Sequence, residues 1–395
     1  MEEKLIIEIN DDKIKYAVFA ADEKFNYQIV NKKISSNAGI KKGKISDFNY
    51  TAKIINEDLE SIEKEVKKVF KNISVVVNEK DLFCTNLSGF KKLNGSKVEK
   101  RDLDYILNEA KNSITKNREK DSILHILNSN FILDKTKQKK MPLNIFGDHL
   151  SLHMTFISIP KNNLKNIDSI FNHNHLQVDR IISKPLVDGI YLLNKKKDLK
   201  NFIIINVDNE LSTVSLYEDT SLVFFKTFPF GSNAIYEDLI QLCSLKREEI
   251  ELIIDGFNFD NLQENKDKYI GKKFFTKSDF KKLSIEHIHN IIEARIKEII
   301  DYTFNKNKNL NYLDNKISNV YLFFENEIIY KNLENLFKKS INTNHNKALI
   351  ESLKQDDFGS LLGAAELIFK GWHKEAIPFS NKKKSIISGF FERFF

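Results

Sequence analysis

Two segments of the chain, about 197 residues apart, share one pattern of apolar runs and polar turns, and this repeat limits the possible folds. Residues 4–9 form an apolar run, a polar turn follows at 10–12, and further apolar runs cover 14–20 and 27–30. The pattern recurs as runs at 203–205, 213–216 and 223–228 around a turn at 208–210. Short apolar runs divided by turn residues are typical of a β-meander. We therefore expect two similar α/β lobes, each beginning with three strands.

Helical and strand periodicity fill in the rest of each lobe. In the first lobe the spacing predicts a helix over 51–71, a strand over 73–77, a helix over 164–173 and a strand over 178–182. In the second lobe it predicts helices over 234–243, 247–254, 284–304 and 328–337 and a strand over 320–324. A final helix over 359–369 is rich in small residues, so another backbone can approach it closely.

An added α/β subdomain interrupts the first lobe at residues 82–160. Strand patterns at 82–87, 123–133 and 150–159 surround a helix pattern near 99–114. The predicted domains are a first lobe at 1–81 with 161–196 and 359–378, the insertion at 82–160, and a second lobe at 197–358 with an appendage at 245–300. Residues 379–395 form a linker and a terminal helix.

Composition excludes several classes of protein. Of the 395 residues, 41% are hydrophobic and 30% charged, which is typical of a globular chain. The net charge is +7, but only six of the 62 basic residues are Arg, so we expect no nucleic-acid face. Cys84 and Cys243 cannot form a disulfide framework, and no apolar run reaches the ~20 residues that span a bilayer. We expect an intracellular chain.

Glycine spacing argues against a phosphate-binding enzyme. A loop that cradles phosphate needs clustered glycines, so that successive backbone N–H groups converge without Cβ clashes. The 13 glycines here are dispersed, and no GG or GxG sequence occurs. Walker A and Rossmann fingerprints are therefore absent.

Metal and nucleophile chemistry have little support. His173 and His175, like His287 and His289, stand two residues apart, a spacing that on a helix directs the side chains away from each other. We expect these histidines on a solvated surface, and we expect no metal site. Neither Cys lies in a catalytic motif, and the acid pairs at 11–12 and 248–249 fit solvent or a helix first turn. We therefore name no catalytic residue.

The carboxy-terminal segment carries the clearest positive signal. At ~100° per residue, its large apolar side chains cover one half of a helical wheel. Its candidate membrane-binding residues are Lys382, Lys383, Lys384, Ile386, Ile387, Phe390, Phe391, Arg393, Phe394 and Phe395. Aromatic residues on one face and cations beside it are typical of a helix that lies in a membrane surface with anionic headgroups. The alternative is that this helix docks on its own core or on a partner.

Motifs in this order resemble the FtsA family of actin-like bacterial cell-division proteins. The matching stretches are residues 36–47, 123–134, 144–147, 229–239 and 292–299, and the inserted subdomain and terminal helix stand in the family's positions. The resemblance implies a two-lobed actin-like (duplicated ribonuclease-H-like) α/β fold with an inserted subdomain and a carboxy-terminal amphipathic helix.

The resemblance also implies an ATP/Mg site, but the glycine loops of that site are lost. Its first loop resembles residues 8–13, with Glu8 and Lys13 kept and Asn10 in the place of Gly. Its second loop corresponds to 206–210, where Asn206 replaces the metal-associated Asp. Gly231 and Glu251 are the remaining candidate nucleotide contacts, and residues 323–325 replace its third glycine turn. We expect weak or no ATP binding and no ATP turnover.

The family's partners follow from the same resemblance. They are the carboxy-terminal peptide of FtsZ, further copies of the chain in actin-like filaments, other divisome proteins and the anionic membrane surface. The implied location is the cytoplasmic face of the inner membrane, peripheral, at the division septum. Arg295 is the candidate for pairing with an FtsZ carboxylate, and an ion pair with Glu298 is the alternative.

Two other classes share these lobes. A pilus-assembly protein of the PilM type grips a peptide of an inner-membrane partner and does not need the aromatic tail. A sugar kinase or ATPase needs the missing glycines. The tail favours the FtsA-like hypothesis.

Overall fold

Two sheets of this chain have the same strand order, which explains the repeat in the sequence. The computed structural model describes residues 2–11, 13–36, 39–260, 267–310, 319–342 and 349–377. It divides into two units: unit 1 holds residues up to 200, the segment 216–225 and the described residues from 358 onward, and unit 2 holds 201–215 and 226–357.

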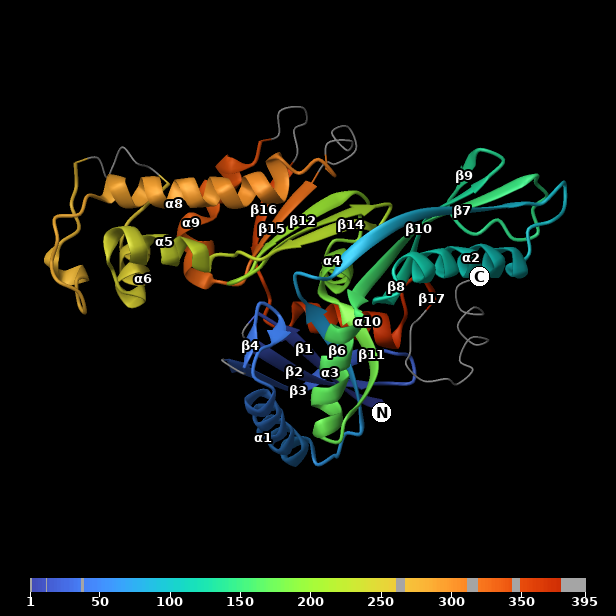
Figure 1. Cartoon of the computed structure of the whole chain (residues 1–395), viewed down its shortest axis with the longest axis horizontal. Helices are drawn as coiled ribbons and strands as arrows, with labels where there is room; N and C mark the ends of the chain where they lie inside the picture. The colour runs from blue at the N-terminus through green and yellow to red at the C-terminus, as the bar shows by residue number, and fades with distance from the viewer. Residues whose placement is uncertain are drawn as a thin grey trace. The chain divides into compact units, whose positions relative to one another are not determined.

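The sheet of unit 1 has the order β11-β6-β1-β2-β3 (Figure 1). Its strands are β1 (Glu2–Asn10), β2 (Lys13–Ala21), β3 (Tyr27–Ser36), β6 (Asn72–Asn78) and β11 (Gln177–Ser183). The first three form an antiparallel meander, and β6 and β11 add in parallel on the other side of β1. The predicted meander, the strand near 73–77 and the strand near 178–182 are thereby confirmed.

The second sheet repeats this plan in the order β14-β13-β12-β15-β16. Its strands are β12 (Phe202–Val207), β13 (Ser212–Glu218), β14 (Ser221–Phe228), β15 (Asn319–Phe324) and β16 (Leu349–Lys354). Here too two parallel strands, β15 and β16, extend the sheet beyond the first strand of the meander. The duplicated α/β fold expected from the sequence is confirmed.

Helices surround the two sheets. Unit 1 contains α1 (Phe48–Val66), α3 (Lys161–His173), α4 (Lys184–Lys195) and α10 (Gly359–Phe369), with a small hairpin of β4 (Ile40–Lys41) and β5 (Lys44–Ile45). Unit 2 contains α5 (Asn233–Cys243), α6 (Arg247–Gly256), a 3-10 turn η1 (Lys272–Phe274), α8 (Ile285–Ile300) and α9 (Glu327–Ser340). The helix expected over 284–304 ends earlier, because a π-helical turn (Asp301–Asn305) follows α8.

The inserted subdomain is a sheet covered by one helix. Its elements are β7 (Phe83–Lys92), α2 (Lys100–Asn117), β8 (Asp121–Leu133), β9 (Thr136–Gln138) and β10 (His149–Pro160), and β17 (Glu375–Ile377) joins its edge in the order β17-β8-β10-β7. Ile106 and Leu107 of α2 pack on Leu152, Met154 and Phe156 of β10 in one buried cluster. Figure 1 shows α2 along one face of this sheet. The predicted insertion is confirmed.

Helices α4 and α10 pack backbone to backbone in unit 1. A Cβ atom at Gly363 would stand 2.0 Å from the carbonyl oxygen of Val187, so only glycine allows this approach. Ser360 Oγ donates to Asp188 Oδ1 at 2.7 Å, and the buried Lys184 lies 3.3 Å from the other carboxylate oxygen. The small residues of the predicted final helix therefore have the expected role, with α4 as the partner helix.

Candidate functional site

The turn between β1 and β2 is closed by the protein's own polar groups. Asn78 Nδ2 donates to Asn10 Oδ1 at 3.0 Å, and Gly43 N donates to the Asp11 carbonyl oxygen at 3.2 Å. A Cβ at Gly43 would lie 1.8 Å from the carbonyl oxygen of Asn78 at the end of β6, so the β4–β5 hairpin needs this glycine to pack against β6. The candidate Glu8 is fully buried on β1, and Lys13 is half-buried on β2 opposite Asn10.

The loop between β12 and β13 is closed in a similar way. Ser232 N donates to the Asp208 carbonyl oxygen at 2.9 Å, and Asn233 N donates to that of Asn209 at 2.8 Å. A Cβ at Gly231 would stand 2.3 Å from the Asp208 oxygen, so Gly231 is fixed by this contact. Asn206, at the end of β12, is 2% exposed. The structure thus brings the loop after Asn206 onto Gly231 at the start of α5.

The amides at the start of α5 are engaged by the neighbouring β12–β13 loop. Phosphate binds where backbone N–H groups at a helix N-terminus point outward to the ligand. The first amides of α5 instead donate to carbonyl oxygens of the neighbouring loop. Asp208 and Glu210 add negative charge there, and like charges repel at short range. In the β12–β13 loop, the first amides of α5 are thus engaged within the protein, and two acidic residues lie in the same loop.

The candidate Glu251 lies on α6 in a small polar cluster of unit 2. Its carboxylate is 3.4 Å from Arg247 Nε, and the Arg247 guanidinium stacks 4.3 Å from the centre of the Tyr236 ring. Arg247 Nη2 also donates to Asn233 Oδ1 at 2.9 Å. Burial, with the nearby Glu251 charge, raises the pKa of Tyr236 to about 12. Glu251 thus helps to hold Arg247 over Tyr236.

Arg295, the candidate partner contact, is engaged within unit 2. Its Nε and Nη2 atoms donate to the two carboxylate oxygens of Asp238 on α5, at 2.6 and 2.7 Å, and Nη1 donates to Glu298. The hydrogen bond to Asp238 is the main cause that raises the pKa of Arg295. The ion pair with Glu298, left open by the sequence, is present, and Asp238 is a second partner that the sequence did not indicate.

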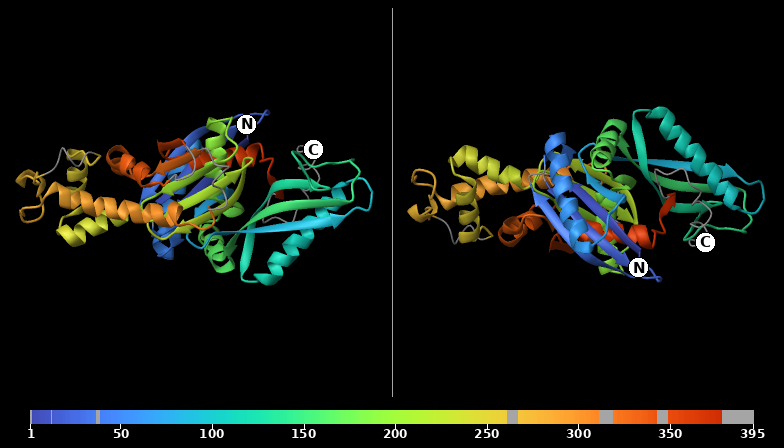
Figure 2. Two further views of the ribbon diagram at one scale, coloured as in Figure 1. Left: turned by 90° about the horizontal axis from the view of Figure 1, so that it is seen from above. Right: turned by 90° about the horizontal axis from the view of Figure 1, so that it is seen from below.

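The appendage carries exposed apolar side chains beside lysines. Figures 1 and 2 show α6 and the segment 267–284 at the end of unit 2 away from its sheet. Leu252, Tyr269 and Phe280 are 48%, 51% and 54% exposed. The exposed lysines around them are Lys268, Lys272, Lys273, Lys277, Lys281 and Lys282. This surface is both apolar and basic.

Glu249 fixes the base of the appendage. This buried carboxylate accepts hydrogen bonds from the backbone amides of Lys246, Lys277 and Ser278 at 2.7 to 2.8 Å, and from Ser278 Oγ at 2.6 Å. Burial alone would raise its pKa, but these hydrogen bonds outweigh burial and lower the pKa to about 2. Sequence reasoning placed this acid in a helix first turn, which is right, but did not indicate its contacts with residues 277–278.

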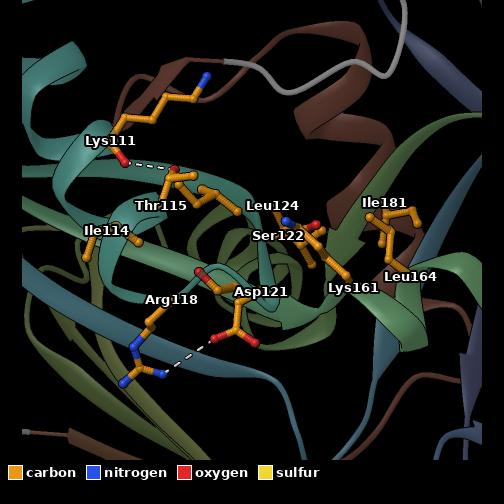
Figure 3. A pocket seen from close by; sticks show the side chains of 12 residues that line it. Lys111, Ile114, Thr115, Arg118, Asp121, Ser122, Leu124, Lys161, Leu164 and Ile181 are labelled. Carbon is orange, nitrogen blue, oxygen red and sulfur yellow. Dashed lines mark hydrogen bonds and ion pairs between the residues drawn. The ribbon is translucent and has the colours of Figure 1, made fainter.

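A pocket of about 260 Å³ lies within unit 1, between the inserted subdomain and α3. Figure 3 shows Lys111, Thr115 and Arg118 on one side of it and Lys161 and Leu164 on the other. Arg118 pairs with Asp121 at 3.8 Å on its rim. Its volume is slightly below the ~300–1,000 Å³ of small-molecule sites.

Thiols and histidines give no sign of catalysis in the described residues. Burial raises the pKa of Cys84 to about 11 and also raises that of Cys243, so both thiols stay protonated at neutral pH. Within the described ranges no three His, Cys, Asp or Glu side chains are placed to hold a metal ion. His173, His175 and His287 are exposed as expected. His289 is 5% exposed and stacks on Phe259, so its predicted place on a solvated surface is wrong.

The ten candidate membrane-binding residues at 382–395 lie outside the described residues, as does the linker before them. In the part of the chain that the structure describes, no helix is long and apolar enough to cross a membrane.

Comparisons with known proteins agree with the inserted subdomain. Residues 80–158 match the family model of the SHS2 domain inserted in FtsA. The cell-division protein FtsA of Agrobacterium fabrum is 24% identical over 217 residues, which cover 54% of this chain and 48% of that protein. FtsA of Buchnera aphidicola subsp. Schizaphis graminum is 21% identical over 280 residues, or 71% and 66% of the two chains. The match thus spans about half the length of the Agrobacterium relative.

A solved structure supports the actin-like fold. The PilM–PilN type IV pilus biogenesis complex contains a chain that aligns with a TM-score of 0.54, covering 94% of this chain and 97% of that chain, at 8% identity. At this identity the likeness concerns the fold alone.

Proposed function

This chain is a divergent member of the FtsA family, and from that premise we propose that it is a cell-division scaffold that tethers FtsZ filaments to the inner face of the cytoplasmic membrane. The body would supply the contacts with FtsZ, and the carboxy-terminal amphipathic helix the contact with lipid. The proposed location is peripheral, on the cytoplasmic face of the membrane at the division septum. No catalysis is needed for this role.

One observation carries the proposal. The β7–α2–β8–β9–β10 subdomain interrupts an actin-like repeat between β6 and α3 and matches the domain inserted in FtsA. Actin-like lobes alone occur in proteins of many functions, so the fold does not choose among them. The insertion and the FtsA relatives together favour cell division over kinase or ATPase chemistry.

The tail supplies the membrane contact in this proposal. Six large apolar side chains occupy one half of the predicted helix at 385–395, and three lysines precede it. Burying each apolar side chain fully is worth ~1.5–3 kcal/mol, and each lysine adds about 1 kcal/mol near an anionic surface. Ordering the helix offsets several kcal/mol of this gain. One copy would therefore bind weakly, and a filament of copies firmly.

The appendage is the proposed site for the FtsZ tail. An apolar surface bordered by lysines is complementary to an acidic peptide with apolar anchors. Arg295 is the proposed partner for one carboxylate of that peptide. This carboxylate would replace Glu298 as a hydrogen-bond acceptor of the guanidinium. We expect Arg295→Ala to lower peptide affinity in fluorescence anisotropy and Asp238→Asn to leave it unchanged. Equal losses in both variants would assign Arg295 a purely structural role between α5 and α8.

Nucleotide has a minor role in this proposal. Actin-like folds generally bind nucleotide, but the two loops described above are closed on themselves. We propose that ATP/Mg binds weakly or not at all, that filaments form by self-association of the body, and that other divisome proteins join this assembly.

Vesicle flotation tests the proposal and its main alternative. Purified FtsZ should float with anionic vesicles only when the full-length chain is present, and not with a version ending at Lys384. A PilM-type protein needs a membrane partner instead, so it would not float with pure lipid at all. Flotation of the truncated version with FtsZ would contradict the proposed role of the tail.

A further inference from the structure

One edge of the inserted subdomain collects lysines from three segments of unit 1. Four of them, Lys135, Lys137, Lys139 and Lys140, lie in or next to the β8–β9 hairpin, and all four are exposed. Lys374 precedes β17, and Lys200 follows α4. We call these six lysines the basic edge.

Strand pairing brings these lysines together. β9 pairs with residues 131–133 of β8, and β17 pairs with residues 126–127 of the same strand. Because β10 occupies the other side of β8, β9 and β17 lie along one edge, as Figure 1 shows. β9 runs antiparallel to β8, so Lys139 and Lys140 continue from Gln138 toward the point where the Lys374 carbonyl accepts from Asn128 N at 2.7 Å.

Positive charge on this edge exceeds the nearby negative charge. Asp219 forms an ion pair with Lys137, and the hydrogen bond from Lys137 is the main cause that lowers the pKa of Asp219. The charges of Lys374 and Lys200 lower this pKa further. Asp134 is engaged by the backbone amides of Asp148 and His149 at 2.8 to 3.1 Å. Within the described residues, Lys135, Lys139 and Lys140 have no acidic partner. The edge therefore presents an uncompensated positive field to solvent.

The carboxy-terminal segment leaves the structure from this same edge. β17 ends at Ile377, and seven residues (378–384) separate it from Ser385, where the predicted amphipathic helix begins. Even a fully extended stretch of that length spans only ~25 Å. A helix lying in a membrane surface would therefore keep the basic edge within a short distance of the headgroups.

We propose that the basic edge is a second lipid-contact surface, which binds an anionic bilayer together with the terminal helix and so orients unit 1 on the membrane. The inference rests on the proposed function, because the helix brings the edge to the bilayer. Its chemistry differs from that of the tail, since it is electrostatic and has no apolar wedge. Lysine without arginine also suits a field of headgroups better than bidentate recognition of one phosphate.

Vesicle partitioning of the full chain tests the proposal. The test variant is Lys135→Asn, Lys139→Gln and Lys140→Gln. Asn is used at 135 because the backbone there has φ +69°, which Asn tolerates. Lys137 is kept because it pairs with Asp219, and Lys374 is kept because its charge acts on the same carboxylate. The matched control removes three exposed lysines at the α1 end of unit 1, as Lys53→Gln, Lys64→Gln and Lys71→Gln. A third protein lacks residues 385–395.

On vesicles of phosphatidylglycerol and phosphatidylcholine, we expect the test variant to partition about a hundredfold more weakly than the control, since each of its three lysines would contribute roughly a fivefold factor near an anionic surface. The difference should disappear on pure phosphatidylcholine and at salt high enough to shorten the Debye length to about 3 Å. Equal partitioning of test and control variants on anionic vesicles would overturn the proposal that the basic edge contacts lipid, and would leave the proposed function intact. Unchanged partitioning of the tail deletion overturns the proposed function instead.

Discussion

At the scale of single residues, glycine lets separate parts of this chain pack closely on each other. A Cβ at Gly43 would meet the carbonyl oxygen of Asn78 at the end of β6 at 1.8 Å, and a Cβ at Gly231 would meet that of Asp208 in the β12–β13 loop at 2.3 Å. In a phosphate-binding loop, glycine lets backbone amides approach a ligand. Here it lets one part of the protein approach another, so internal packing accounts for these two glycines.

The Glu249 carboxylate offers a test at this scale. It accepts four hydrogen bonds, and an amide in its place has only one acceptor oxygen. We expect Glu249→Gln to lower the free energy of unfolding by about 1–3 kcal/mol at neutral pH, the usual effect of leaving buried polar groups unsatisfied. A urea titration measures this change, and hydrogen exchange should locate it in α6 and residues 277–278.

The pH dependence of that effect has a definite sign. The folded-state pKa of Glu249 is about 2, below the ordinary value of 4.5. The unfolded chain therefore binds more protons in this range, and the stability supplied by Glu249 is complete above pH 4.5 and is lost as the pH falls toward 2. The difference in the free energy of unfolding between wild type and Glu249→Gln should become smaller at low pH. Glu248→Gln is the control, because Glu248 is exposed, and a similar loss in that variant would contradict the assignment.

At the scale of elements, the sequence predicted the helices and strands whose apolar residues recur with a clear helical or strand period. The helix over 359–369 has the same bounds in the structure, and most other predicted helices and strands agree within a few residues. Helix α4 was missed, and its polar residues Lys184 and Asp188 are buried and pair with each other instead of facing solvent. The three-residue β17 is too brief for a periodic signal and depends on its partner β8. Strand β16 is as long as β15, but its apolar residues stand at 349, 350 and 353 without a regular alternation.

The contact between α4 and α10 gives a prediction for these elements. We expect Gly363→Ala to destabilise unit 1 by about 1–3 kcal/mol, because the added methyl group forces the two helix backbones apart. Thermal unfolding followed by circular dichroism measures the loss. Gly271→Ala is the matched control, since a Cβ there meets no atom within 4 Å. Equal melting temperatures for both variants would show that the α4–α10 packing yields easily.

The candidate site was only partly predictable at either scale. The absence of clustered glycines could be predicted from the sequence alone, because a phosphate-binding loop needs its glycines close together in the chain. The engagement of Arg295 by Asp238 could not, since 57 residues separate them and only the packing of α5 on α8 brings them together. The basic edge likewise depends on β9 and β17 sharing one side of β8.

At the scale of the whole molecule, the chain is a duplicated actin-like fold with one inserted domain. The two sheets share an order of strands although their turn residues differ. We therefore expect that the chain keeps the actin-like fold but binds ATP weakly or not at all. In ATP-titration calorimetry we expect no binding tighter than about 10 µM, with an ATP-binding actin-like protein as positive control. A tighter dissociation constant would show that the closed loops rearrange to admit phosphate.

The central claim is that this chain works at the division site through its carboxy-terminal helix. Fluorescence imaging in dividing cells tests it most directly, with the full-length chain compared with a version lacking residues 385–395 at equal abundance. We expect a mid-cell band for the full-length chain and diffuse fluorescence for the shortened one. A mid-cell band that persists without those residues would contradict it.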